Sequence, residues 1–344
     1  MRRRSTSLAA LVTVGVIALT GCGGGSGAKS TASKDPQAAF ATGLSGLSDT
    51  DALTVMLKLD TTADALIGFA KESGDSLDAA TAQHIATAAV LFETKTNDGT
   101  KLSDIKPGTK VNAATRVAIQ DNGKTLGEFR SVDESLYAQA DVKTLLDLFG
   151  ESKSYADLTA RASQMPAFVQ AFVNGQWVVL DLNAVKALAG QFGGAAASPS
   201  TQQAQKLLTD LKAVIGKDVT VTRVGSDADG DHLKLTTQSR AFVTDLVQTV
   251  GADLPAASLA TGSLKPGNVP DHPVVIDAWV KDGALSKLSI DVVQFAKPSE
   301  VKPGDSLPVV LTFDQSGDDI SKPSNATPVD TTALFTLLGS LGGK

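Results

Sequence analysis

The chain has 344 residues, of which 42% are hydrophobic and 20% charged, and its formal net charge is −6. A chain of this length can bury a substantial hydrophobic core, whereas its acidic balance argues against nucleic acid or an anionic lipid headgroup as the main partner. The single cysteine excludes a disulfide framework and a metal site built from thiolates.

The chain begins with the pattern of a secretory leader. Three arginines at positions 2–4 precede an apolar stretch from Leu8 to Leu19, which is too short for a membrane span of roughly 20 apolar residues. The run LTGC at 19–22 resembles a lipobox, in which the cysteine thiolate is the nucleophile that accepts a diacylglyceryl group. We therefore expect a lipoprotein signal peptide over 1–21 and lipid attachment at Cys22. The alternative is a structural cysteine in a leader that is removed whole.

The segment 22–37 is rich in Gly and Ser and lacks large apolar residues. It predicts a flexible tether with a reach on the order of 20 Å, which would hold the protein at the outer face of the cytoplasmic membrane. Loss of 1–21 removes three arginines from the 31 basic residues and leaves 28 against 37 acidic residues, a net charge of about −9. No long linker is evident after residue 38, so we expect a single ligand-binding domain over 38–344.

The folded part is predicted to open with a strand and a helix. Residues 53–59 alternate apolar and polar side chains, as a half-buried strand does. Residues 62–73 are predicted to form a helix that carries Leu66 and Phe69.

A second helix is predicted over 76–92. Ser76 is its expected N-cap, and Ile85 and Phe92 fall on one apolar stripe at helical spacing. The same segment is rich in alanine, and small side chains on a helix that covers a sheet leave room for an apolar gap.

Strand and turn signals then dominate. Residues 116–132 hold Asn122-Gly123 between two alternating runs, which is a strong hairpin signal. The run SLYAQADV continues the meander, and Asp141 is expected to cap the short helix VKTLLDLF. Helices are predicted in YADLTARAS and PAFVQAF, and the second ends at Asn174-Gly175.

The second half of the chain returns to the same elements. It opens with the strand QWVVLDL, a helix over 183–192, a loop over 193–200 and a helix capped by Ser200. Two hairpins, VTVTRVGSDADGDHLKLTT and VVIDAWVKDGALSKLSIDVVQF, flank the helix RAFVTDLVQTVG, and the strand LPVVLTFDQ precedes a closing helix, TTALFTLLGSLG. About ten or eleven strands in hairpins and six to eight clumped helices predict an α+β fold with a largely antiparallel sheet.

Catalytic motifs are missing from the sequence. It contains no nucleophile-elbow, zinc-protease, P-loop or dinucleotide-binding motif. Two matches to the pattern S-x-x-K, at 103–106 and 299–302, run into Pro-Gly turns, whereas a nucleophilic serine needs a rigidly placed base. We expect a protein that is not an enzyme, with no catalytic residue and no cofactor; an unrecognised Asp/Glu pair is the alternative.

Residues that bind metals are also sparse. The three histidines, His84, His232 and His272, have no mutual ligand spacing. The run DADGD at 227–231 is similar to the start of a calcium loop, but its glycine comes at the fourth position rather than the sixth, and the twelfth position is Gln238. We therefore expect a polar hairpin tip and no metal site.

Several segments together resemble a known family. The leader and lipobox, the run FVNGQWVVLDL, the run DAWVKDGALSKLSIDVVQF and the ending LPVVLTFDQSGDDISKPS look like those of the LppX/LprG-type lipoproteins of high-GC Gram-positive bacteria, which are LolA/LolB-like in fold. The resemblance covers roughly residues 50–330. It implies a strongly curved antiparallel half-barrel with helices packed on its concave face, and a protein that binds or moves lipid or glycolipid in the cell envelope.

The expected function is therefore that of a membrane-anchored extracytoplasmic lipoprotein that binds or carries a lipid or other apolar ligand. Acyl chains buried between sheet and helices gain about 25 cal/mol per Å² and require no catalytic group. The ligand-pocket candidates, chosen by helix position, are Leu66, Phe69, Ile85 and Phe92. Trp177 and Trp279 are expected to pack in the core, with a ligand wall as the alternative. The alternative function is an accessory or sensor domain that binds an envelope protein partner without lipid.

Overall fold

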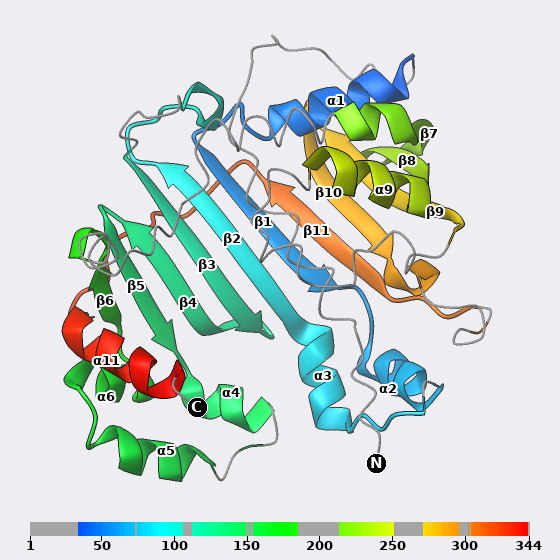
Figure 1. Cartoon of the computed structure of the whole chain (residues 1–344). Coiled ribbons are helices and arrows are strands. Elements are labelled where there is room, and N and C mark those ends of the chain that lie inside the picture. The colour runs from blue at the N-terminus through cyan, green and yellow to red at the C-terminus, as the bar shows by residue number, and fades with distance from the viewer. Residues whose placement is uncertain are drawn as a thin grey trace. The chain divides into compact units, whose positions relative to one another are not determined.

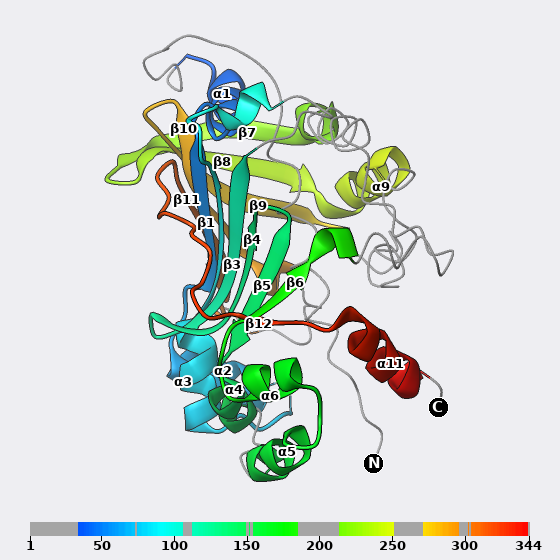
Figure 2. The same cartoon turned by 90° about the vertical axis from the view of Figure 1, so that its left-hand side faces the viewer.

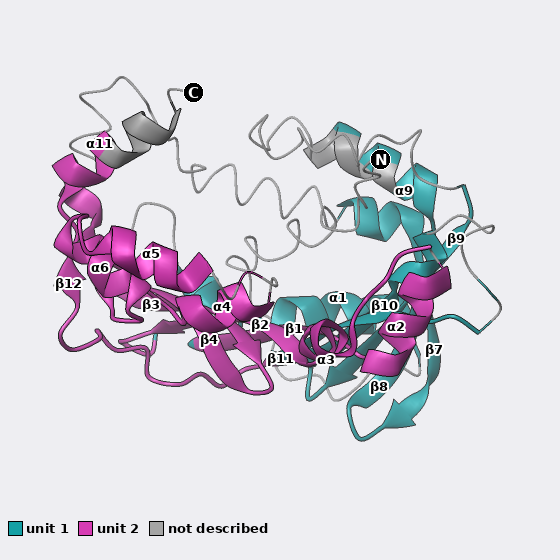
Figure 3. Cartoon of the chain, turned by 90° about the horizontal axis from the view of Figure 1, so that it is seen from below, with its two compact units in different colours: residues 1–51, 100–110, 198–313 teal, residues 52–99, 111–197, 314–344 magenta. Residues whose placement is uncertain are grey.

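The computed structural model describes residues 34–72, 74–105, 112–148, 151, 154–184, 213–250, 271–295, 302 and 304–342 (Figure 1). The chain divides into two compact units (Figure 3). Unit 1 comprises residues 1–51, 100–110 and 198–313, and unit 2 comprises residues 52–99, 111–197 and 314–344. A single domain over 38–344 stays a prediction.

Both units combine helices with antiparallel strands, so the predicted α+β class is confirmed. The described residues form twelve strands, close to the ten or eleven predicted. The strand order is β12-β6-β5-β4-β3-β2-β1 in unit 2 and β11-β10-β9-β8-β7 in unit 1. Within the described residues, the short β12–β6 pair is parallel and the other strand pairs within each unit are antiparallel.

Unit 2 contains most of the helices that the structure describes. Its strands are β1 (Ala52–Leu59), β2 (Ala88–Thr96), β3 (Ala113–Asp121), β4 (Lys124–Val132), β5 (Ser135–Ala140), β6 (Val178–Asp181) and β12 (Thr327–Pro328). Its helices are α2 (Ala63–Glu72), α3 (Ala79–Thr87), α4 (Val142–Leu148), α5 (Ser154–Ala162), α6 (Ala167–Val173) and α11 (Thr331–Gly342).

Unit 1 is built on two hairpins and an additional strand. Its strands are β7 (Val219–Asp227), β8 (Gly230–Gln238), β9 (Pro273–Lys281), β10 (Ala284–Asp291) and β11 (Pro308–Asp314). Its helices include α1 (Pro36–Gly46), α9 (Ser239–Val250) and the short 3₁₀ helices η2 (Leu102–Asp104) and η5 (Val292–Phe295).

Helix α1 was not predicted from the sequence. Asp35 caps it by accepting a hydrogen bond from the Ala38 N–H at 2.9 Å, and Pro36 occupies the first helical turn, where its missing N–H costs nothing. Ala39 and Phe40 are buried where the helix packs on the strands of unit 1. The last two residues of the predicted tether, Pro36 and Gln37, therefore belong to this helix.

The predicted helix over 76–92 is wrong beyond Thr87. Helix α3 is capped by Asp78 rather than Ser76, because the Asp78 carboxylate accepts from the Thr81 N–H at 3.0 Å, and the strand β2 begins at Ala88. From there β2 pairs with β1 on one side and β3 on the other. Those two ladders satisfy the backbone of β2 and override the helix propensity of its alanines.

Local turn signals were predicted correctly. Asn122 and Gly123 form the β3–β4 turn with φ of 48° and 76°, the left-handed pair that a two-residue hairpin favours. Asp141 caps α4 by accepting from the Thr144 N–H at 3.0 Å. The chain leaves α6 at Asn174 and Gly175, and Gly175 has a φ of 72°.

Some predicted elements lie outside the described residues. They are Cys22 with its leader and most of the tether, the helix over 183–192 beyond residue 184, the loop over 193–200 and the helix capped by Ser200 up to residue 212.

Candidate functional site

One face of the β1–β4 sheet in unit 2 carries no charged side chain over three successive rows of paired residues. Paired residues on neighbouring strands point to the same side of a sheet. The register aligns two apolar rows: Val55, Phe92, Val117 and Phe129, and next to it Leu57, Val90, Ile119 and Gly127. A third row adds hydroxyl groups: Leu53, Thr94, Thr115 and Ser131. We call these three rows the uncharged face.

The central side chains of the uncharged face are unusually accessible for a sheet of apolar residues. Phe129 is 49% exposed, Ile119 44%, Val90 39% and Val117 36%. The ends of the rows are covered. Val55 is buried on β1, and beyond Phe129 the first row continues into Ala138 and Val178, which pack with α6 and α11. An accessible apolar patch therefore remains on β2, β3 and β4, which are neighbouring strands in Figure 1.

The opposite face of the same strands carries a buried ionic cluster. The Arg116 guanidinium donates from Nη1 to Glu93 at 2.9 Å and from Nε to Glu128 at 2.9 Å. Arg130 donates to Glu128 at 2.5 Å. Glu93 and Glu128 are almost fully buried, so these pairs are needed to compensate the cost of removing two carboxylates from water.

The pKa of Arg116 reflects this environment. Burial opposes the charged form of the guanidinium, but the hydrogen bonds that it donates to Glu128 and Glu93 outweigh burial and raise the pKa of Arg116 above its usual value. The hydrogen bonds of this guanidinium are thus used within the fold.

A C-terminal segment, residues 314–326, covers this ionic face, and we call it the strap. It accepts hydrogen bonds from Thr54 at the Ser316 carbonyl (2.8 Å) and from Arg130 at the Ser321 carbonyl (3.0 Å). Ile320 of the strap is buried with Ala114, Val132 and Tyr137. Figure 2 shows the strap and α11 on opposite sides of the strands. Unit 2 therefore hides its charged side beneath its own chain and leaves apolar side chains of the other side accessible.

The four predicted pocket residues are distributed over three elements. Phe92 lies on the uncharged face, but on the strand β2 instead of the predicted helix. Leu66 is buried on α2, Phe69 is partly buried on the same helix, and Ile85 is 37% exposed on α3. Helix α2 follows β1 and α3 leads into β2 (Figure 1).

Sequence reasoning missed Val117, Ile119 and Phe129 because it searched the helices for the ligand wall. The signal was present in the hairpin at 116–132. Along β3 the apolar Val117 and Ile119 alternate with Arg116, which is the period of a strand with two different faces.

The three aspartates of the acidic tip at 227–231 are bound by other side chains of unit 1. Trp279 donates from Nε1 to Asp227 at 2.8 Å, Lys287 pairs with Asp229 at 2.9 Å, and Arg223 pairs with Asp231 at 3.0 Å. The tip is thus polar, as predicted. No cluster of three or more histidine, cysteine or acidic side chains suited to a metal occurs among the residues that the structure describes.

The histidines and tryptophans take part in packing. His84 contacts Asp121 at 2.7 Å, which ties the end of α3 to the β3–β4 hairpin. His232 stacks on Trp279 with 4.4 Å between ring centroids, and Trp279 is nearly buried. Trp177 packs against the cluster around Ile320 and lies under the guanidinium of Arg130. The expected structural role of both tryptophans agrees with these contacts.

The described residues thus form an α+β protein with an accessible apolar surface on the sheet of unit 2. Neither a scan of protein families nor a search of characterised protein sequences finds a match for the chain. Among solved structures it is similar to the lipoprotein LppX of Mycobacterium tuberculosis, with 12% identity and a TM-score of 0.31 over 84% of this chain and 99% of that chain. It is also similar to LprF from Mycobacterium bovis, with 12% identity and a TM-score of 0.33 over 85% of this chain and 98% of that chain. Both are lipoproteins of the LppX/LprG family, which the sequence resembles.

Within the described ranges, none of the helices has both the length and the apolar character needed to cross a bilayer.

Proposed function

We propose that the protein is a lipid-anchored extracytoplasmic lipoprotein that binds a lipid or another apolar ligand on the uncharged face. The observation that carries the proposal is the accessibility of Val90, Ile119 and Phe129 on strands whose opposite face holds the buried carboxylates of Glu93 and Glu128. A sheet exposed on one side normally places its polar side chains in water and its apolar ones inside. Unit 2 reverses this arrangement on β2–β4.

The chemistry of the uncharged face fits an acyl chain. The two apolar rows offer no side-chain hydrogen bonds, and covering them with hydrocarbon gains about 25 cal/mol per Å². The third row places Thr94, Thr115 and Ser131 side by side at one end. A ligand with an apolar body and a polar end therefore matches the gradient from the apolar rows to the hydroxyl row. No catalytic group is required.

The membrane anchor is the second part of the proposal. Lipidation at Cys22 would attach the chain to the cytoplasmic membrane, because each buried methylene contributes about 0.8 kcal/mol and several acyl chains give a stable anchor. The tether would then hold the folded part, with its acidic surface, close to the source of apolar ligands.

A protein partner is the alternative occupant. The same exposed side chains, Ile119 and Phe129 among them, would suit an apolar protein surface in the envelope. The two functions differ in what copurifies with the chain. Lipid binding predicts a copurified acyl ligand, and the alternative predicts a partner protein and no lipid.

A binding titration tests the proposal. The full chain with Cys22→Ala, which removes the anchor lipid as a competitor, is titrated with a fluorescent long-chain fatty acid. We expect saturable binding that Phe129→Ser or Ile119→Ser weakens by roughly tenfold or more, because each loses most of a buried side chain's contribution. Val224→Ser is the matched control, since Val224 is 54% exposed on a strand of unit 1 and should have no effect.

Two results would contradict lipid binding on the uncharged face. One is the absence of saturable fatty-acid binding by the Cys22→Ala chain together with the absence of lipid in its organic extract. The other is an equal loss of affinity in the Val224→Ser control, because the bound probe would then not lie on the uncharged face.

A further inference from the structure

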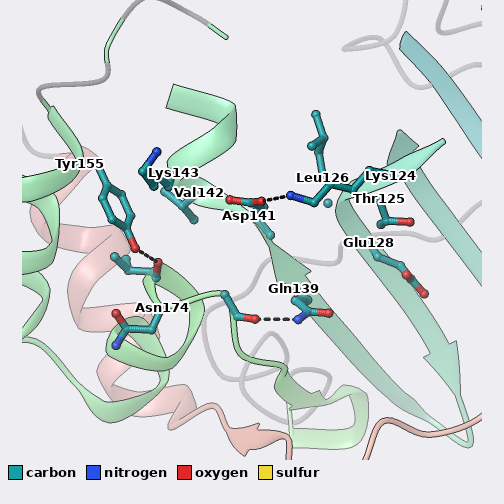
Figure 4. Close-up of a pocket in the computed structure, with 14 residues that line it drawn as sticks. Lys124, Thr125, Leu126, Glu128, Gln139, Asp141, Val142, Lys143, Tyr155 and Asn174 are labelled. Atoms are coloured by element: carbon teal, nitrogen blue, oxygen red, sulfur yellow. Dashed lines mark hydrogen bonds and ion pairs between the residues drawn. The ribbon is translucent and has the colours of Figure 1, made fainter. Parts of the chain in front are cut away.

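A cavity of about 390 Å³ lies within unit 2, where β4 begins and β5 ends (Figure 4). It forms because β6 pairs with β5 only from Ser135 to Ala138, so Gln139 extends beyond its partner strand. Gly175, in the left-handed conformation, turns the chain away at that point. The Gln139 side chain bridges the gap by donating to the Gly175 carbonyl at 2.6 Å.

The charges at the cavity are already compensated. Lys124 pairs with Asp141 at 2.8 Å, and Lys143 pairs with Asp147 at 2.8 Å. Glu128, which also lines the cavity, is held by Arg116 and Arg130. A free anion or cation would therefore have to break an existing ion pair to gain one of its own.

Neutral hydrogen-bonding groups remain around the same cavity. Asn174 is exposed, and its side-chain amide has no hydrogen-bond partner among the described residues. The Tyr155 hydroxyl makes a single long contact of 3.5 Å with the Val173 carbonyl, so it can turn to a ligand at little cost. Thr125 contributes a further hydroxyl, and the Tyr155 ring offers an apolar surface (Figure 4).

We propose that this cavity binds a neutral polyhydroxylated ligand, a sugar ring or a polyol. Such a ligand needs many donors and acceptors, no net charge and one apolar surface, which is what Asn174, Tyr155 and the Lys124–Asp141 pair supply. The volume falls at the lower end of the roughly 300–1,000 Å³ of small-molecule sites, and it suits a mono- or disaccharide. The proposal does not depend on lipid binding at the uncharged face.

Calorimetric titration of the full chain in detergent micelles tests this inference. The probes are methyl glucoside, maltose and myo-inositol, with sodium phosphate as the anionic comparison, and a glucosyl diacylglycerol presents the same sugar as a lipid headgroup. We expect binding of at least one neutral probe and none of phosphate. Asn174→Ala and Tyr155→Phe should each weaken that binding by roughly fivefold, the effect of one lost hydrogen bond.

Gln176→Ala is the matched control, because Gln176 is exposed close to Asn174 but does not line the cavity, and it should leave binding unchanged. Binding of free sugars would identify a soluble ligand, and binding of the glycolipid alone would identify a headgroup; both support the polyhydroxyl site. Binding of phosphate in preference to the neutral probes, or of none of the probes, would overturn the proposal. So would equal weakening by Gln176→Ala.

Discussion

At the scale of single residues, the ionic cluster decides which side of the sheet in unit 2 is closed. Arg116 connects Glu93 and Glu128 and, together with Arg130 at Glu128, compensates the cost of burying the two carboxylates. The cluster also fixes the strands that carry Val117 and Phe129, since Arg116 and Glu128 directly adjoin them in sequence. Burial of the ionic cluster on one side of the strands therefore places Val117 and Phe129 on the other side.

The first prediction concerns this cluster. Arg116→Ala should lower the free energy of unfolding by about 3–5 kcal/mol, because it removes the guanidinium paired with the buried Glu93 and leaves the buried Glu128 with Arg130 alone. Urea unfolding followed by circular dichroism measures the change. Arg223→Ala is the control, because it breaks a more exposed pair with Asp231 and should cost less than about 1 kcal/mol. Equal effects of the two substitutions would contradict the assigned role of Arg116.

The second prediction concerns Asp141. Its hydrogen bond with Lys124, followed by those with Thr144, outweighs its partial burial and lowers the pKa of the carboxyl from 3.8 to about 2. A depressed pKa stabilises the fold above the unfolded pKa of about 3.9, and that contribution disappears as the pH falls through 2. Asp141→Ala should therefore lower the free energy of unfolding by about 0.5–2 kcal/mol near neutral pH. The substitution removes the charge of Asp141 and also the N-cap of α4.

The measurement is urea unfolding of the wild type and Asp141→Ala between pH 7 and pH 2. The difference in stability should narrow on acidification from about pH 4 downward. A difference that stays constant over this range would show that the charge of Asp141 contributes nothing.

At the scale of elements, structure set by local sequence could be predicted, whereas structure set by pairing with distant strands could not. The β3–β4 hairpin follows from Asn122-Gly123 because the turn conformation is encoded in those two residues. The strand β2 was mistaken for a helix because its alanine-rich start matches helical spacing, while the deciding ladders come from β1 and β3. The site could be predicted in part: Phe92 was selected, but its strand neighbours on β3 and β4 were not.

The third prediction concerns the packing of α1 on unit 1. A Cβ placed on Gly46 would overlap the carbonyl oxygen of Gly283 in the β9–β10 turn. Gly46→Ala should therefore destabilise the protein by about 1–3 kcal/mol, as overpacking does. Gly68→Ala is the control, because Gly68 lies in α2 with open space around it, and that change should stabilise by about 0.5–1 kcal/mol. Thermal unfolding of the two variants should shift in opposite directions, and a shift in the same direction would refute the close contact.

At the scale of the whole molecule, we propose a lipid anchor at Cys22 and a separate ligand-binding surface, the uncharged face. Cys22→Ala should move the protein from the membrane fraction to the soluble fraction, because no acyl chain then holds it. Ser26→Ala, four residues further along the tether, is the control and should leave the protein in the membrane fraction. A Cys22→Ala protein that still sediments with membranes would contradict the anchor.

The central claim is that an acyl chain lies on the uncharged face, and photo-cross-linking tests it most directly. The full chain with Cys22→Ala is irradiated with a diazirine-labelled fatty acid, digested and mapped by mass spectrometry. The account predicts cross-links on the peptides of β2, β3 and β4 that contain Phe92, Ile119 and Phe129, and their loss when unlabelled fatty acid competes. Cross-links confined to unit 1, or unaffected by the competitor, would contradict it.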